Sequence, residues 1–221
     1  MRRFPLLAAL TVVTLGVFAA RCASTSTADE VAPLGFDISE AQADTLVLGG
    51  GCFWCMEPPF EALDGVASVV SGFAGGDTVD PTYDEVSSKR TNHVEVVEVV
   101  YDPSRVSVET LLQTYWHNVD PFDGGGQFCD RGSPYRPAIF APTPEVRALA
   151  EAQKSAIAER FGEPVAVEIL DGAPFYAAEG YHQDFYRTNA AHYKSYRAGC
   201  RRDARLAQVW GEAAGTAGEA L

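Results

Sequence analysis

Two cysteines three residues apart follow a run of three glycines, and this segment is the strongest chemical signal in the chain. The glycines at 49–51 precede Cys52, and Cys55 follows after two large aromatics, Phe53 and Trp54. Glycine relaxes the backbone, so Cys52 can sit at a tight turn near free amide N–H groups. A helix N-terminus stabilises negative charge, and thiolate is the reactive form of cysteine. We therefore expect Cys52 to be a nucleophile held as a thiolate, beside an apolar pocket.

The elements around this segment must place Cys52 between a strand and a helix. The apolar residues 46–48 predict a short buried strand. Pro58 and Pro59 predict the first turn of a helix, because proline is tolerated only near a helix start. The helix N-terminus then lies at residues 55–57, with Cys52 just ahead of it.

The rest of the chain alternates predicted strands and helices. Strands are expected over residues 66–74, 93–101, 138–140 and 165–170, and helices over 106–119 and 144–161, with Ser107 and Thr143 as caps. Residues 81–83 are expected in an irregular loop, and residues 120–137 form a long glycine-rich loop, which favours a functional role. Residues 181–211 are rich in aromatic and then basic side chains. The mixture predicts an α+β sandwich.

The strand over residues 93–101 carries two carboxyl groups of interest. Alternation places Glu95 on one face and Glu98 on the other, and both faces are otherwise mostly apolar. At least one carboxyl should therefore lie in low dielectric, where its pKa rises. The pattern alone does not choose between the two.

The composition limits the classes of protein to which the chain can belong. The chain has 221 residues, of which 47% are hydrophobic and 21% charged, so it is globular and fits one ordinary domain. Its formal net charge of -13 would repel a phosphate backbone or an anionic lipid surface. We expect no nucleic-acid partner.

The N-terminus has the layout of an export signal. Two arginines precede an apolar run that ends near residue 20, and serine- and threonine-rich sequence follows. We expect a signal at 1–23, a flexible polar leader at 24–43, a single catalytic domain at 44–212 and a flexible tail at 213–221. Location in the periplasm or cell envelope follows. Lipidation of Cys22 is a disfavoured alternative, because Arg21 precedes it where such sites have a small residue.

Four cysteines remain when Cys22 is set aside, and they allow three pairings. In an oxidising compartment they can serve as structural bridges, as in a non-enzymatic envelope binding module. Alternatively, Cys52 and Cys55 resemble the paired cysteines of a thiol–disulfide oxidoreductase, although the cis-proline loop expected of a thioredoxin-like chain cannot be located.

A third reading comes from motifs along the chain. It resembles the peptide-methionine (S)-S-oxide reductases, the A-type methionine sulfoxide reductases, from about Leu46 to Gly211. The resemblance rests on Gly51-Cys52-Phe53-Trp54, Pro81-Thr82-Tyr83, His93-Val94-Glu95-Val96-Val97, Cys129-Asp130-Arg131-Gly132 with Tyr135-Arg136, and Tyr181-His182-Gln183-Asp184. The expected fold is a two-layer α/β sandwich with a mixed, mainly antiparallel sheet, a ferredoxin-like core and an irregular C-terminal segment.

The resemblance implies a reaction at Cys52. Its thiolate attacks the sulfoxide sulfur, methionine leaves, and a sulfenic acid remains on the enzyme. Glu95 matches the acid that protonates the sulfoxide oxygen, which a carboxyl kept neutral by burial can do. Tyr83 and Tyr135 match the tyrosines that hydrogen-bond this oxygen.

Three further residues match the family's site. Asp130 corresponds to an active-site aspartate that holds water or hydroxyls in place, and Phe53 and Trp54 would enclose the substrate methyl group. No metal site and no bound cofactor are expected. The substrate is free methionine sulfoxide or oxidised protein, and we expect a monomer.

Turnover requires a second thiol that converts the sulfenic acid to a disulfide. Cys200 resembles the family's mobile resolving cysteine, while Cys55 stands where many members have glycine. Cys129 would complete a relay or pair with Cys200 structurally. The external reductant is expected to be a thioredoxin-like protein, with dithiothreitol as its substitute in vitro.

Overall fold

The sheet is built on a β-α-β-β-α-β core. The computed structural model describes residue 1 and residues 42–216. In chain order the core elements are β1 (Asp44–Gly49), α1 (Glu57–Glu61), β2 (Val66–Ala74), β3 (Val94–Tyr101), α3 (Val108–His117) and β6 (Ala138–Ala141). The four strands lie in the order β6-β1-β3-β2, each antiparallel to its neighbour. This order is that of the ferredoxin-like fold, as expected.

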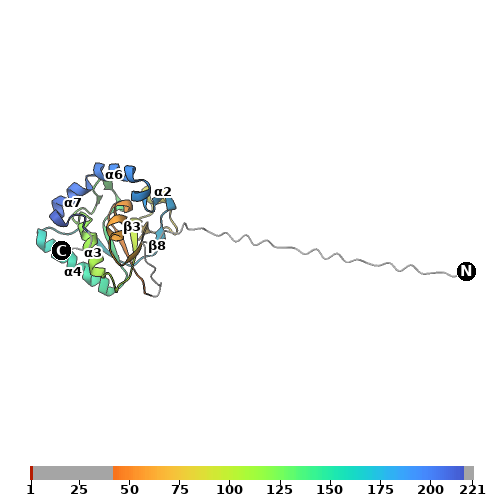
Figure 1. Ribbon diagram of the computed structural model, residues 1–221, viewed down its shortest axis with the longest axis horizontal. Coiled ribbons are helices and arrows are strands. Elements are labelled where there is room, and N and C mark those ends of the chain that lie inside the picture. Colours follow the sequence, from red (N-terminus) through yellow and green to blue (C-terminus); the bar gives the residue numbers. More distant parts are fainter. Residues whose placement is uncertain (2–41, 217–221) are drawn as a thin grey trace.

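Two edge strands extend this core. β7 (Glu168–Asp171) pairs in parallel with β6, and β8 (Phe175–Ala177) pairs antiparallel with β2. The result is a six-stranded, mixed and mainly antiparallel sheet, which lies at the centre of the molecule (Figure 1). The predicted α+β class is confirmed.

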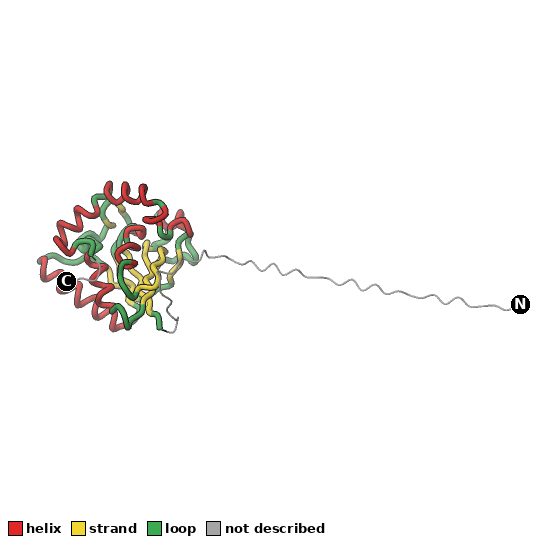
Figure 2. The backbone as a smooth tube through the Cα atoms, in the orientation of Figure 1, coloured by secondary structure: helices red, strands yellow, loops and turns green. Residues whose placement is uncertain are grey.

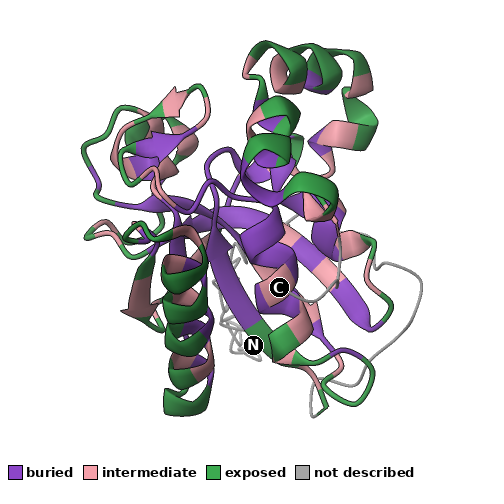
Figure 3. Ribbon diagram, turned by 90° about the vertical axis from the view of Figure 1, so that its left-hand side faces the viewer, coloured by how far each residue is buried: buried purple, intermediate pink, exposed green. Residues whose placement is uncertain are grey.

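Helices cover one face of the sheet. α1, α3 and α4 (Pro144–Phe161) pack their apolar side chains against Leu48, Val97 and Val99 in the larger core cluster. Val94 and Val96 point to the opposite face and join a smaller cluster with Phe140. β3 is therefore buried on both faces, as its alternation predicted. Figure 3 shows this arrangement as a buried sheet beneath helices whose outer sides are exposed.

Several elements differ from the expected ones. The segment expected as a loop around residues 81–83 begins a helix, α2 (Tyr83–Ser87), which Thr82 caps together with Glu85 in a reciprocal capping box. The loop at 120–137 contains a short hairpin of β4 (Gly126–Gln127) and β5 (Asp130–Arg131), followed by the 3-10 turn η2 (Ser133–Tyr135). β7 begins three residues later than predicted.

The C-terminal segment, expected to be irregular, is largely helical. After the 3-10 turn η3 (Gly180–His182) come α5 (Phe185–Thr188), α6 (Ala190–Gly199), α7 (Arg202–Trp210) and the turn η4 (Gly211–Ala213). α6 buries Tyr193, and α7 buries Leu206, Val209 and Trp210 at helical spacing, so each helix has only a short apolar stripe. α6 lies at the top of the molecule and α7 at its upper left (Figure 2).

The chain ends also bear on the predictions. Apart from residue 1, the predicted signal at 1–23 lies outside the described residues, as does nearly all of the predicted leader. No helix within the described part is long and apolar enough to cross a membrane. Thr216, within the predicted tail at 213–221, hydrogen-bonds His117 and Asn118 at the end of α3.

Candidate active site

One cavity of about 60 Å³ brings the predicted site residues together. Seven of them line it, and an eighth side chain, Tyr196, was not predicted. The lining residues are Cys52, Phe53, Trp54, Tyr83, Glu95, Asp130, Tyr135 and Tyr196. They come from β3, α2, α6, the hairpin region and the turn after β1, so segments distant in sequence meet here.

The glycine run presents Cys52 at the end of β1, where it precedes the 3-10 turn η1 (Phe53–Cys55). Gly51 has a φ of +83°, which favours glycine, and a Cβ on it would lie 2.6 Å from the Gln127 side chain. A Cβ on Gly50 would lie 2.5 Å from the Met56 sulfur. The turn therefore requires glycine for both conformation and space.

The protonation of the two cysteines differs from the expectation. The side chains of Cys52 and Cys55 are hydrogen-bonded to each other. Burial raises the pKa of the Cys52 thiol well above its ordinary value, and the neighbouring Cys55 and Glu95 raise it further. The hydrogen bond from Cys52 lowers the pKa of Cys55 to about 6, and the charges of Arg202 and Arg197 contribute. The direction at Cys52 is therefore opposite to the expected one: burial raises its pKa, and the lowered pKa is that of Cys55.

Glu95 lies at the start of β3, on the face that carries the cavity. Its side chain is 2% exposed, and one carboxyl oxygen accepts a hydrogen bond from the Phe53 backbone N–H at 3.3 Å. Burial raises the pKa of Glu95 to about 8. At neutral pH this carboxyl holds a proton that it can donate. Glu98 is half-buried on the opposite face of β3, away from the cavity.

The two tyrosines face Glu95 across the cavity. Tyr83 is the first residue of α2 and Tyr135 the last of η2, and their hydroxyls are hydrogen-bonded to each other. Burial, followed by the nearby Glu95, raises the pKa of Tyr83 to about 12 and that of Tyr135 further still. Both hydroxyls therefore remain protonated hydrogen-bond donors at neutral pH.

The aromatic wall is held by the segment around His182. The Trp54 ring stacks on Phe185 at 3.8 Å, and its Nε1–H donates to His182 Nδ1 at 3.2 Å. Burial lowers the pKa of His182, so the ring is neutral. Gln183 bonds the backbone of Ser71 with both its oxygen and its nitrogen, at 2.9 Å each, and thereby ties this segment to β2.

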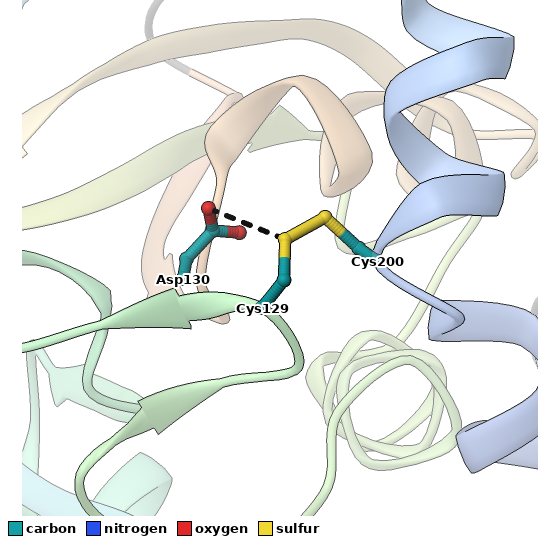
Figure 4. A group of neighbouring side chains, drawn as sticks. All are labelled: Cys129, Asp130 and Cys200. Carbon is teal, nitrogen blue, oxygen red and sulfur yellow. Dashed lines mark hydrogen bonds between the residues drawn. A yellow bond between two sulfur atoms is a disulfide. The ribbon is translucent and has the colours of Figure 1, made fainter.

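The other two cysteines of residues 42–216 form a disulfide next to the cavity. Cys129 and Cys200 are bonded, which leaves Cys52 and Cys55 as free thiols. Cys129 Sγ lies 3.8 Å from a carboxyl oxygen of Asp130 (Figure 4). Cys129, Asp130 and Cys200 are the one cluster of potential metal ligands within residues 42–216, and sulfurs bonded to each other are not thiolate ligands.

A family model described as peptide methionine sulfoxide reductase matches residues 44–214, more than half of the chain. The chain belongs to the peptide methionine sulfoxide reductase family. This reductase is therefore an oxidoreductase that reduces methionine sulfoxide. The alternatives of a thiol–disulfide oxidoreductase and of a binding module with structural disulfides are set aside.

Individual relatives agree with this assignment. The reductase is 49% identical over 164 residues to peptide methionine sulfoxide reductase MsrA of Bacillus subtilis, covering 73% of this chain and 93% of the relative. It is 46% identical over 175 residues to MsrA 2 of Caulobacter vibrioides, covering 79% and 89%. Among solved structures, methionine sulfoxide reductase A of Corynebacterium diphtheriae superposes with a TM-score of 0.64 at 34% identity, covering 71% of this chain and 80% of that one.

Two residues of the reductase's site escaped sequence analysis. Tyr196 enters the cavity from α6, and Arg202 lies fully buried behind the glycine turn, where its guanidinium donates to the Gly50 and Asn118 carbonyls. Both lie in the segment expected to be irregular. The sequence offered one signal for them, which is proximity to Cys200. Tyr196 lies four residues before Cys200, and Arg202 lies two residues after it.

A buried carboxyl outside the cavity gives a prediction about the reductase's stability. Glu57 is fully buried and accepts a hydrogen bond from Ser71 Oγ at 2.7 Å, and burial raises its pKa to about 8. A raised folded-state pKa contributes stability at low pH that is lost as pH rises from about 4.5 to about 8. Replacing Glu57 with Gln should remove this loss, on the order of 3 kcal/mol.

Urea unfolding of the wild type and of Glu57→Gln at pH 5 and pH 8 tests this. Relative to the wild type, the variant should have a larger free energy of unfolding at pH 8 than at pH 5. An equal difference at both pH values would show that Glu57 has no raised pKa.

Proposed function

We propose that the protein reduces the S epimer of methionine sulfoxide, free or within oxidised exported proteins, by attack of Cys52 on the sulfoxide sulfur. The observation that carries this proposal is that Cys52 shares one small cavity with a carboxyl whose pKa is raised to about 8. The sulfoxide oxygen is a poor leaving group until it is protonated. Glu95 donates that proton, and the hydroxyls of Tyr83 and Tyr135 orient the oxygen.

Groups in this site account for every proton and for the oxygen in the first half of the reaction. Cys52 gives its proton to the Cys55 thiolate and attacks the substrate sulfur. The oxygen passes to the Cys52 sulfur, so methionine leaves and Cys52 becomes a sulfenic acid. Phe53 and Trp54 line the wall that would hold the substrate methyl group.

The second half uses the cysteine that lies against Cys52. The Cys55 thiol attacks the sulfenic sulfur, a Cys52–Cys55 disulfide forms, and water leaves. Cys200 with Cys129 then accepts the oxidising equivalents by thiol–disulfide exchange. The observed state, with Cys129 bonded to Cys200 and the other pair free, corresponds to the end of this relay.

The outer disulfide is where a reductant would act. Cys129 is exposed, and a hollow of about 350 Å³ beside Cys200 is lined by Asp120, Asp123, Phe128, Arg201, Ala204, Arg205 and Gln208. A thioredoxin-like dithiol that attacks this bond would restore the enzyme without any bound cofactor. The N-terminal sequence supports action on exported proteins in the periplasm or envelope.

The order of the cysteines gives a second prediction. One equivalent of methionine sulfoxide, added to the fully reduced protein, should produce a Cys52–Cys55 bridge before Cys129 and Cys200 are oxidised, as read by rapid quenching and peptide mass mapping. In Cys55→Ser the Cys52 sulfenic acid should persist and be trapped by dimedone. A direct Cys52–Cys200 bridge in the wild type would show that Cys55 is bypassed.

The activity itself is tested with free methionine sulfoxide and dithiothreitol. Separated S and R epimers, each followed by chromatography of methionine, should give product from the S epimer. Product from the R epimer alone would refute the stereochemical proposal.

A further inference from the structure

Tyr196 enters the active-site cavity without any role in the proposed chemistry. Its hydroxyl donates a hydrogen bond to one carboxyl oxygen of Asp130, and its oxygen accepts one from the Cys52 thiol. Its ring meets Trp54 edge-on, with centroids 5.9 Å apart. Tyr196 therefore contacts the nucleophile, the aspartate and the aromatic wall at once.

The disulfide joins the two segments that carry this hydrogen bond. Asp130 directly follows Cys129, and Tyr196 precedes Cys200 by one helical turn. The backbone N–H of Cys200 donates to the Tyr196 carbonyl at 2.9 Å, so the bonded cysteine is part of the same turn. A bond between Cys129 and Cys200 thus limits how far Tyr196 can move from Asp130.

We propose that Tyr196 is a positioning residue of this reductase, which orients the Asp130 carboxyl and the Cys52 side chain and is held in place by the Cys129–Cys200 disulfide. The inference rests on the proposed role of Cys52 as the nucleophile. It is independent of which cysteine resolves the sulfenic acid, because the contacts precede that step.

The test compares two tyrosine-to-phenylalanine variants. Tyr196→Phe keeps the ring and removes the hydroxyl, whereas Tyr186→Phe, the control, removes a tyrosine–carboxylate hydrogen bond to Glu61 outside the cavity. Single-turnover release of methionine, without a reductant, should slow at least about tenfold in Tyr196→Phe, because the hydrogen bond to the Asp130 carboxyl is lost. Tyr186→Phe should match the wild type.

A second readout separates positioning from general structure. In a Cys55→Ser background, the pH midpoint for alkylation of Cys52, read on its peptide by mass spectrometry, should move to higher pH in Tyr196→Phe. Once Cys52 ionises, the hydroxyl can turn its proton from Asp130 to the thiolate, which lowers the pKa of Cys52, so loss of the hydroxyl should disfavour ionisation. An unchanged midpoint, or an unchanged single-turnover rate, would overturn the proposal.

The role of the disulfide is tested by a double-mutant cycle with Cys129→Ser. If the bond holds Tyr196 in place, Cys129→Ser should slow the single turnover, and Tyr196→Phe should add less than its full effect in that background. Fully additive effects would overturn the clamping role. Failure of Cys52→Ser to lose activity would instead refute the proposed function, so the two failures are distinguishable.

Discussion

Replacing Cys52 with Ser should abolish methionine formation, with a loss of at least about 10⁴-fold in rate. Serine is similar in size and retains a hydrogen-bonding group, so the turn after β1 and the 3-10 turn η1 should persist. Its hydroxyl is far less acidic than a thiol and is a poor nucleophile toward sulfur. The measurement is methionine released from methionine sulfoxide in the presence of dithiothreitol.

The contrast with the neighbouring cysteine makes this result specific. Without a reductant, Cys55→Ser should still release one equivalent of methionine, more slowly than the wild type, whereas Cys52→Ser should release none. Near-ultraviolet circular dichroism and the intact Cys129–Cys200 bond check that Cys52→Ser is folded. Release of one equivalent by a folded Cys52→Ser would assign the nucleophile to another residue.

Replacing Glu95 with Gln should lower the single-turnover rate by about 10²- to 10⁴-fold, the usual range for a positioned general acid. The amide oxygen can still accept the hydrogen bond from the Phe53 N–H, but the side chain has no acidic proton to donate. The wild-type rate should fall as pH rises through about 8, where Glu95 loses its proton. Glu95→Gln should lack this decline.

Glu98→Gln is the matched control, because Glu98 lies on the opposite face of the same strand. It should keep both the rate and the pH profile of the wild type. Glu57 also has a pKa near 8, so Glu57→Gln must retain the alkaline decline if Glu95 causes it. A near-wild-type rate in Glu95→Gln would show that another group is the acid.

Local signals explain which parts of the fold were predictable. β2 and α4 have the predicted bounds, because β-branched residues bounded by glycine mark the strand, and Thr143 with Pro144 marks the helix start. α2 was missed although Thr82 and Glu85 have capping-box spacing, since only five residues follow the cap. Short helices leave too little periodicity to be recognised.

The site was predictable only where a residue's role matched a motif. Strand alternation left Glu95 and Glu98 equal, and the topology separates them because β1 ends beside the start of β3. Cys52 was expected as a thiolate because its position before a turn is visible in sequence. Its depth of burial, and the approach of Arg197 and Arg202 to Cys55, depend on contacts with the C-terminal helices and were not visible.

The disulfide between Cys129 and Cys200 has a thermodynamic consequence besides its place beside the cavity. The two cysteines are 71 residues apart, so the bond closes a long loop in the unfolded chain. Chain-entropy arguments assign such a loop a contribution of about 4 kcal/mol to the free energy of unfolding. Whichever agent reduces this bond, it leaves a less stable protein, so the melting temperature of this enzyme also reports its redox state.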